Sequence, residues 1–69
     1  MINVRLVNVL LLSNNVRRVT FTYEDRMFPG KRHETLADVH PGYIVTYYDG
    51  GISRTMSDDE AAVILALLK

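Results

Sequence analysis

Residues 43–69 read YIVTYYDGGISRTMSDDEAAVILALLK, and this stretch predicts a β-hairpin followed by a helix. The segments 43–48 and 52–56 are rich in β-branched and aromatic residues, and Asp49-Gly50 lies between them. Asp-Gly between two such runs favours a two-residue turn, because both turn residues must adopt positive φ. The cross-strand pairs that this turn predicts on one side of the sheet are Tyr47–Ile52, Val45–Arg54 and Tyr43–Met56.

In this predicted register Arg54 lies among apolar side chains. A guanidinium group in such surroundings needs a carboxylate, a route to solvent or a binding partner. We expect Arg54 to pair with a carboxylate at the start of the following helix. The alternative is that Arg54 anchors a partner, so it is a candidate partner-binding residue.

The helix is predicted to start at Ser57-Asp58-Asp59-Glu60, which has the pattern of a capping box and places three carboxylates in the first turn. Residues 61–68 contain no polar side chain. At helical spacing they form two apolar stripes, of which one can cover the sheet and the other needs a neighbour. The first stripe is Ala61, Ile64, Leu65 and Leu68, and the second, a possible apolar interface, is Val63 and Leu67.

The N-terminal third predicts a second hairpin. Residues 2–12 and 16–23 are β-prone, and Ser13-Asn14-Asn15 between them supplies residues that tolerate left-handed backbone. The alternation of the first strand breaks at Asn8. Either a bulge near Leu6 to Asn8 resets the register, or the strand is apolar on both faces and must be central or meet something outside the monomer.

Residues 24–42 have the least periodicity, with Phe28-Pro29-Gly30 and His40-Pro41-Gly42 as breakers, and are expected to be mostly loop. Residues 35–39 fit one helical turn or a short edge strand, and five residues cannot decide between them. The predicted fold is therefore one α+β domain over residues 1–69. It has an antiparallel sheet of four strands, or five, made of two hairpins, with the C-terminal helix packed on one face.

Charge divides this chain into two halves. Residues 1–33 carry six cations and two anions, a balance of +4, whereas residues 34–69 carry two cations and six anions, a balance of −4. Turn and capping roles explain most of the anions. The cations near the first turn and in the long loop have no structural role in the predicted fold, so they are candidate partner-binding residues: Arg17, Arg18, Arg26, Lys31 and Arg32.

No pattern in the sequence predicts a catalytic or metal site. The serines have turn, strand or cap roles and no histidine is positioned beside them, so a nucleophile with an oriented base is not indicated. His33 and His40 are seven residues apart, which matches no standard zinc arrangement, and the chain has no cysteine. We expect no enzyme activity, no metal and no cofactor.

The size of the chain predicts marginal stability. A domain of 69 residues buries only about 60% of the surface that its unfolded chain exposes. Disulfides are excluded, so association with itself or with a partner is the remaining source of stability. No cleavable signal sequence and no apolar run of about 20 residues is present. We therefore expect a cytoplasmic protein without a membrane segment.

Three functions are compatible with these features. The first is a non-catalytic protein that docks on a larger macromolecule through its basic residues, its surplus apolar surface, or both. The second is a nucleic-acid binder that uses the basic loop residues together with nearby aromatic residues such as Phe28, although the chain lacks a net positive charge. The third is a structural homo-oligomer that uses Val63, Leu67 and the extra face of the first strand.

A chain that begins at Met1, lacks cysteine and divides its charge in this way resembles the small host-takeover proteins of bacteriophages. That group includes proteins that bind bacterial RNA polymerase or defence effectors. The resemblance lies in size and layout over the whole chain and transfers no functional residues. It implies inhibition or redirection of a host enzyme by occlusion.

Overall fold

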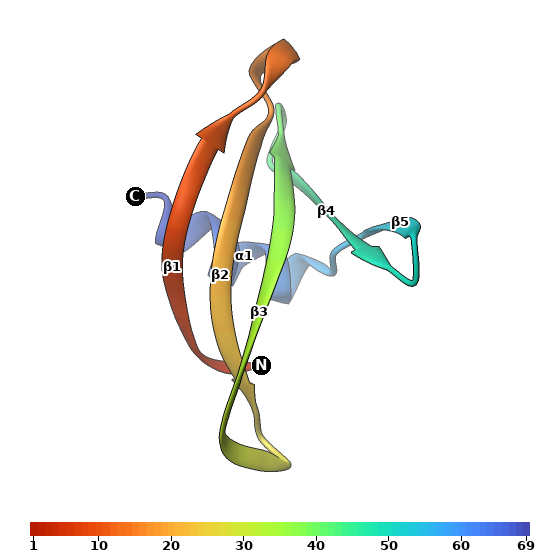
Figure 1. Ribbon diagram of the computed structural model, residues 1–69. Coiled ribbons are helices and arrows are strands. Elements are labelled where there is room, and N and C mark those ends of the chain that lie inside the picture. Colours follow the sequence, from red (N-terminus) through yellow and green to blue (C-terminus); the bar gives the residue numbers. More distant parts are fainter.

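The computed structural model describes all 69 residues, as a five-stranded antiparallel sheet with one helix on one face (Figure 1). The strands lie in the sheet in chain order, which confirms the predicted α+β fold and gives the larger of the two strand numbers. The single helix has ten residues, too few to span a bilayer. The elements are β1 (Ile2–Leu11), a 3-10 turn (Ser13–Asn15), β2 (Arg17–Asp25), β3 (Phe28–His40), β4 (Ile44–Asp49), β5 (Ile52–Thr55) and α1 (Asp58–Leu67).

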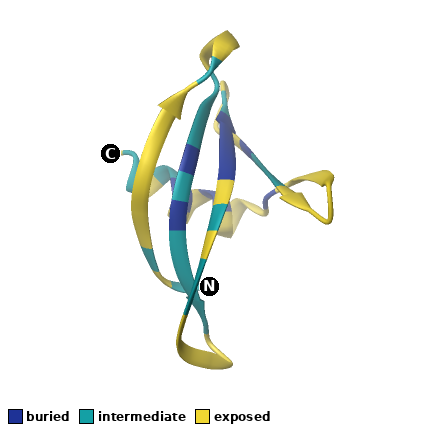
Figure 2. Ribbon diagram, viewed as in Figure 1, coloured by how far each residue is buried: buried dark blue, intermediate teal, exposed yellow.

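The core lies between α1 and the middle of the sheet. Val19 and Phe21 alternate along β2 and are almost completely buried, and Ile64 of α1 belongs to the same cluster. Only nine of the 69 residues are buried, so the core is small. Figure 2 shows that the buried positions concentrate on β2, β3 and the helix, whereas most of β1 and the β2–β3 turn are exposed. The remaining buried apolar residues are Ala37, Val39, Val45, Met56 and Ala61.

The expectation that residues 24–42 are mostly loop is wrong, because residues 28–40 form β3, the longest strand of the sheet. Residues 35–39, which the sequence left open between helix and strand, belong to it. Its first half has no apolar alternation because neither face there is covered by the helix. Pro29 and Gly30 do not break it, since both lie at its very start, beside the turn after Asp25.

The polar half of β3 is stabilised by cross-strand side-chain pairs and not by hydrophobic burial. The rings of Tyr23 and His33 lie with their centroids 5.3 Å apart, and the Arg32 guanidinium forms an ion pair with Glu24 at 3.0 Å. Both pairs follow the β2–β3 register, in which Tyr23 faces His33 and Glu24 faces Arg32. Single-strand patterns cannot reveal this source of stability.

The C-terminal hairpin forms as predicted, but its register differs by two residues. Gly50 and Gly51 are the turn residues, with φ of 61° and 85°, while Asp49 pairs with Ile52. Consequently Arg54 faces Tyr47 and not Val45, so the three predicted cross-strand pairs are wrong. A Gly-Gly turn reaches positive φ at both positions without steric cost, whereas Asp49-Gly50 would place an aspartate there.

The irregularity of the first strand is a bulge, as one of the two alternatives predicted. The β1–β2 register shifts between Leu6 and Asn8, and a second time between Ile2 and Arg5, where Asn3 has a φ of 51°. β1 is nevertheless an edge strand, with β2 as its only neighbour. Its exposed apolar side chains therefore remain uncovered within one chain.

The first turn and the helix cap form as predicted. Asn14 and Asn15 adopt left-handed backbone, with φ of 62° and 61°. The Ser57 hydroxyl accepts a hydrogen bond from the Glu60 N–H at 3.4 Å and caps α1. Of the second apolar stripe, Leu67 packs against the core while Val63 is 39% exposed.

Shortening Ile64 tests how much the sheet depends on its single helix. Ile64 is fully buried, so Ile64→Val should lower the free energy of unfolding by about 0.5–1.5 kcal/mol and Ile64→Ala by about 2–5 kcal/mol. In so small a domain the larger loss approaches complete unfolding. Urea unfolding followed by circular dichroism measures both. Equal, small effects of the two substitutions would contradict the packing described here.

Candidate functional site

Two of the six cations predicted to bind a partner, Arg18 and Arg32, are engaged within the sheet. Arg18 forms a bidentate pair with Asp38, with Nε 2.9 Å from Oδ1 and Nη2 3.0 Å from Oδ2. Arg18 and Asp38 face each other on β2 and β3, on the side of the sheet opposite α1. A guanidinium matched to a carboxylate in this way has a structural role.

This pair changes the ionisation of both partners. The Arg18 hydrogen bonds are the main cause that holds the pKa of Asp38 below its usual range, and the positive charge of Arg18 adds to them. Removal of Asp38 from water acts in the opposite direction and is outweighed. In turn, the hydrogen bond and the charge of Asp38 raise the pKa of Arg18.

Arg32 links β3 to β2 and β1 at the end of the sheet where β2 turns into β3. Its guanidinium donates to the Thr22 hydroxyl, to Glu24 and to the Asn3 backbone carbonyl. The Asn3 amide donates to Glu24 at 3.0 Å and is the main cause of a lowered pKa of Glu24. A backbone hydrogen bond from Gly30 and the Arg32 charge lower that pKa further. The sequence offered no sign that these residues form one network.

Arg54 pairs with Asp49 at 3.2 Å, and both side chains are more than half exposed. The expected partner was a carboxylate at the start of the helix. The difference follows from the hairpin register, because Asp49 and Arg54 lie on neighbouring strands beside the turn. An exposed pair of this kind contributes little to stability, and the Arg54 head group remains accessible.

The other three predicted cations, Arg17, Arg26 and Lys31, form no ion pair. Arg17 begins β2 and Arg26 follows its end, so at about 3.3 Å per residue they lie roughly 30 Å apart. The cations therefore do not form one basic edge. Arg17 instead lines a shallow groove with Tyr43, Leu65 and other residues of α1.

Residues 26–31, which comprise the turn between β2 and β3 and the first four residues of β3, are named here the hairpin tip. It projects beyond the helix at one end of the sheet (Figure 1). Met27 is 83% exposed and Phe28 is 66% exposed, and the two free cations Arg26 and Lys31 flank them. Sequence reasoning considered Phe28 only as a base-stacking residue and missed Met27. The signal was two large apolar residues between cations in a predicted loop.

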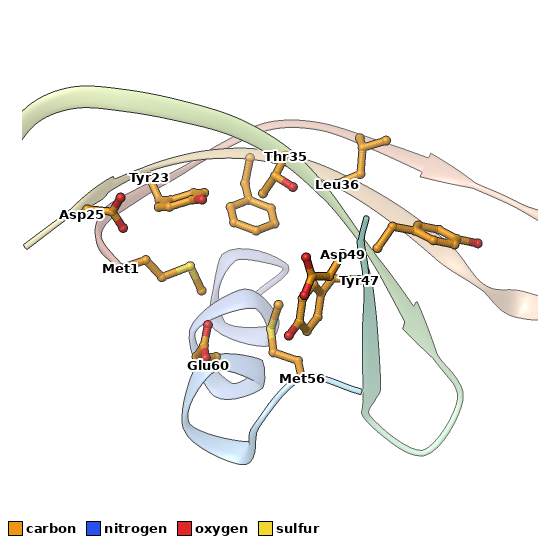
Figure 3. A pocket seen from close by; sticks show the side chains of 11 residues that line it. Met1, Tyr23, Asp25, Thr35, Leu36, Tyr47, Asp49, Met56 and Glu60 are labelled. Atoms are coloured by element: carbon orange, nitrogen blue, oxygen red, sulfur yellow. The ribbon is translucent and has the colours of Figure 1, made fainter. Parts of the chain in front are cut away.

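An open cleft of about 370 Å³ lies where β3 and β4 part above the start of α1 (Figure 3). Tyr23 and Tyr47 line it, and three carboxylates lie around it. No histidine, lysine or arginine lines it, and no group of three His, Asp or Glu side chains in the structure could hold a metal ion. The cleft therefore presents hydrogen-bond acceptors and aromatic rings. The carboxylates are Asp25, Asp49 and Glu60.

His33 lies near the middle of β3 and His40 is its last residue. His33 pairs with Asp25 at 3.4 Å, and His40 shares a hydrogen bond of 2.8 Å with the Thr46 hydroxyl. Seven residues of extended strand separate them by roughly 23 Å. They cannot share a ligand.

Comparison with known protein families, curated proteins and solved structures found no match to this chain.

The Arg18–Asp38 pair should make stability depend on acid pH. Because the pKa of Asp38 is lowered on folding, the pair contributes stability above the unfolded aspartate pKa of about 4. That contribution is lost as the pH falls through the lower pKa of the folded state. We expect the urea midpoint to fall between pH 6 and pH 2, and to fall less in Arg18→Met.

The matched control is Arg54→Met, which removes a cation from an exposed pair. It should show the same acid loss as the unaltered chain. An unchanged acid loss in Arg18→Met would contradict the role assigned to this pair.

Proposed function

We propose that this protein is a non-catalytic binding protein that docks on a larger protein through its hairpin tip and regulates or inhibits that partner. The observation that carries the proposal is the exposure of Met27 and Phe28, at 83% and 66%, between the unpaired cations Arg26 and Lys31. Apolar side chains of this size, gathered at a projecting point and bordered by charge, are typical of contact surfaces.

The base of the hairpin favours docking without large rearrangement. The contact between the tilted rings of Tyr23 and His33, the Glu24–Arg32 ion pair and the Asp25–His33 contact lie directly behind the tip. These contacts join β2 to β3 just before the chain turns. A tip held in this way loses little conformational entropy on binding, which favours affinity.

The chemistry of the tip defines the kind of partner. Methionine adapts to irregular apolar pockets, and an aromatic ring supplies a large buried area. Two free cations favour approach to an acidic surface and increase the association rate. The partner should therefore present an apolar pocket with carboxylates around it, and the bound protein would act by occluding that surface.

The resemblance in size and layout to small host-takeover proteins of bacteriophages guides the search for the partner. Under this proposal the protein acts in the cytoplasm, and bacterial RNA polymerase and defence effectors are the first candidates to test. Nucleic acid is a weaker candidate. With only two free cations at the tip, affinity for duplex DNA would fall with salt at a log–log slope no steeper than about −1.8.

The test compares the unaltered chain with tip variants, each immobilised and exposed to bacterial lysate at moderate salt. The unaltered chain should retain one stoichiometric protein. Met27→Ser/Phe28→Ser should weaken binding to the purified partner roughly 30-fold or more, as expected for loss of central apolar contacts. Arg26→Glu/Lys31→Glu should mainly slow association.

Two controls carry the same chemical changes elsewhere. Arg5→Glu reverses an exposed cation on β1, and Tyr43→Ser removes a side chain that is 78% exposed. Both should bind as the unaltered chain does. Retention of no protein, or equal binding by the tip variants, would refute the proposal.

A further inference from the structure

The outer edge of β1 has two unlike halves. In the first half two register shifts and the positive φ of Asn3 distort the strand, which is how natural edge strands avoid pairing with other chains. From Asn8 to Leu11 the register with β2 is regular. This second half contains no proline and no charged residue. The first half of this edge is therefore protected against pairing with another strand, whereas the second half, the open edge, can pair.

The opposite edge of the sheet makes the contrast clear. β5 has only four residues, includes Arg54 and follows two glycines. Short length and a cation are the usual protection of an edge strand. In β1, by comparison, Val9, Leu10 and Leu11 are 39%, 54% and 70% exposed. Their side chains alternate between the two faces, so the apolar surface lies on both sides of the open edge.

The hydrogen bonds identify the free backbone groups. The Leu12 N–H donates to the Val16 carbonyl at 2.7 Å, in line with the regular register. Because backbone groups alternate in direction along an antiparallel strand, Asn8 and Leu10 also point toward β2. Val9 and Leu11 therefore direct their N–H and C=O groups outward, where no strand lies.

We propose that a second copy of this chain pairs with this open edge, antiparallel, with the two-fold axis at Leu10. Leu10 is the centre of the regular segment 8–12. In this register residues 8–12 of one copy therefore pair with residues 8–12 of the other, and the irregular first half of β1 is not involved. Val9 then exchanges two hydrogen bonds with Leu11 of the second copy, and the symmetry doubles them to four. Asn8 lies opposite Leu12 of the second copy.

Three observations favour a second copy over a foreign strand. The pairing brings no like charges together, because Arg5, the only charge of β1, would lie opposite position 15, beyond the strand. The net charge of the chain is zero, so two copies do not repel each other. A chain with nine buried residues exposes this edge from the moment it folds, and another copy is the partner that is always present.

The resulting dimer has a continuous sheet made from two five-stranded sheets. In one chain α1 lies behind the sheet and its C-terminal end reaches β1 (Figure 1). In the dimer the two helices therefore lie on the same side of the joined sheet. Because the strands run antiparallel, the two hairpin tips lie at opposite ends of the sheet. This inference does not depend on the proposed function, since it uses a different edge.

Sedimentation equilibrium at micromolar concentration should show a dimer. Leu11→Lys places a cation on the open edge at a position already 70% exposed, and should weaken dimerisation at least tenfold with an unchanged circular dichroism spectrum. Val63→Lys makes the same change on the exposed side of α1 and should leave the dimer intact. A monomer in the unaltered chain would overturn the inference.

Cysteine cross-linking tests the register, and the chain has no cysteine of its own. At the two-fold axis Leu10 forms a non-hydrogen-bonded pair with its own copy, with Cα atoms about 4.5 Å apart, which a disulfide can span. Leu10→Cys should therefore oxidise to a covalent dimer. Asn8→Cys is the control, because the two copies of residue 8 lie about 13 Å apart. Efficient cross-linking of Asn8→Cys or Val63→Cys, with none of Leu10→Cys, would refute the proposed pairing.

Discussion

The mismatch in length between the helix and the sheet governs most of this structure. Ten helical residues extend about 15 Å, whereas the molecule is 36 Å long. The helix therefore covers only the middle of one face, where Val19 and Phe21 of β2 meet Ile64. The helix does not cover the two ends of the sheet, most of β1 or the opposite face. Residues there must be stabilised in another way or remain exposed.

Polar pairs replace hydrophobic burial where the helix does not reach. On the open face Arg18 and Asp38 join β2 to β3, and near the lower end Arg32 joins Glu24, Thr22 and Asn3. These contacts explain part of the positive charge in the first half of the chain. Arg18 and Arg32 therefore have structural roles. Arg26 and Lys31, at the hairpin tip, have none.

Exposed apolar side chains are the other consequence, and two groups of them lie on surfaces where a partner can bind. Met27 and Phe28 lie at the tip of the β2–β3 hairpin, and Val9, Leu10 and Leu11 lie along an open strand edge. A tip fits a pocket on a partner, whereas a strand edge fits another strand. We propose docking on a larger protein for the first surface and pairing with a second copy for the other, and both can operate in the same molecule.

Local sequence determined the elements whose signals are contained within a few residues. The alternation around Phe21, the asparagines of the first turn and the Ser57 cap all predict their structures, because turn and capping chemistry acts over short distances. The second hairpin was predicted as well, but its turn is Gly50-Gly51 and not Asp49-Gly50. The bulge near Leu6 to Asn8 was also predicted as one of two alternatives. The α+β fold followed from these elements.

Only the tertiary structure decided which residues are free to bind. Arg18 and Arg32 are indistinguishable from Arg26 and Lys31 in the sequence, and they differ because Asp38 and Glu24 lie opposite them on neighbouring strands. The same is true of β3, whose polar half is a strand because β2 pairs with it, and of β1, which is an edge because no other strand lies beyond it. Register and strand order depend on contacts between residues far apart in the chain, and a local pattern carries no information about such partners.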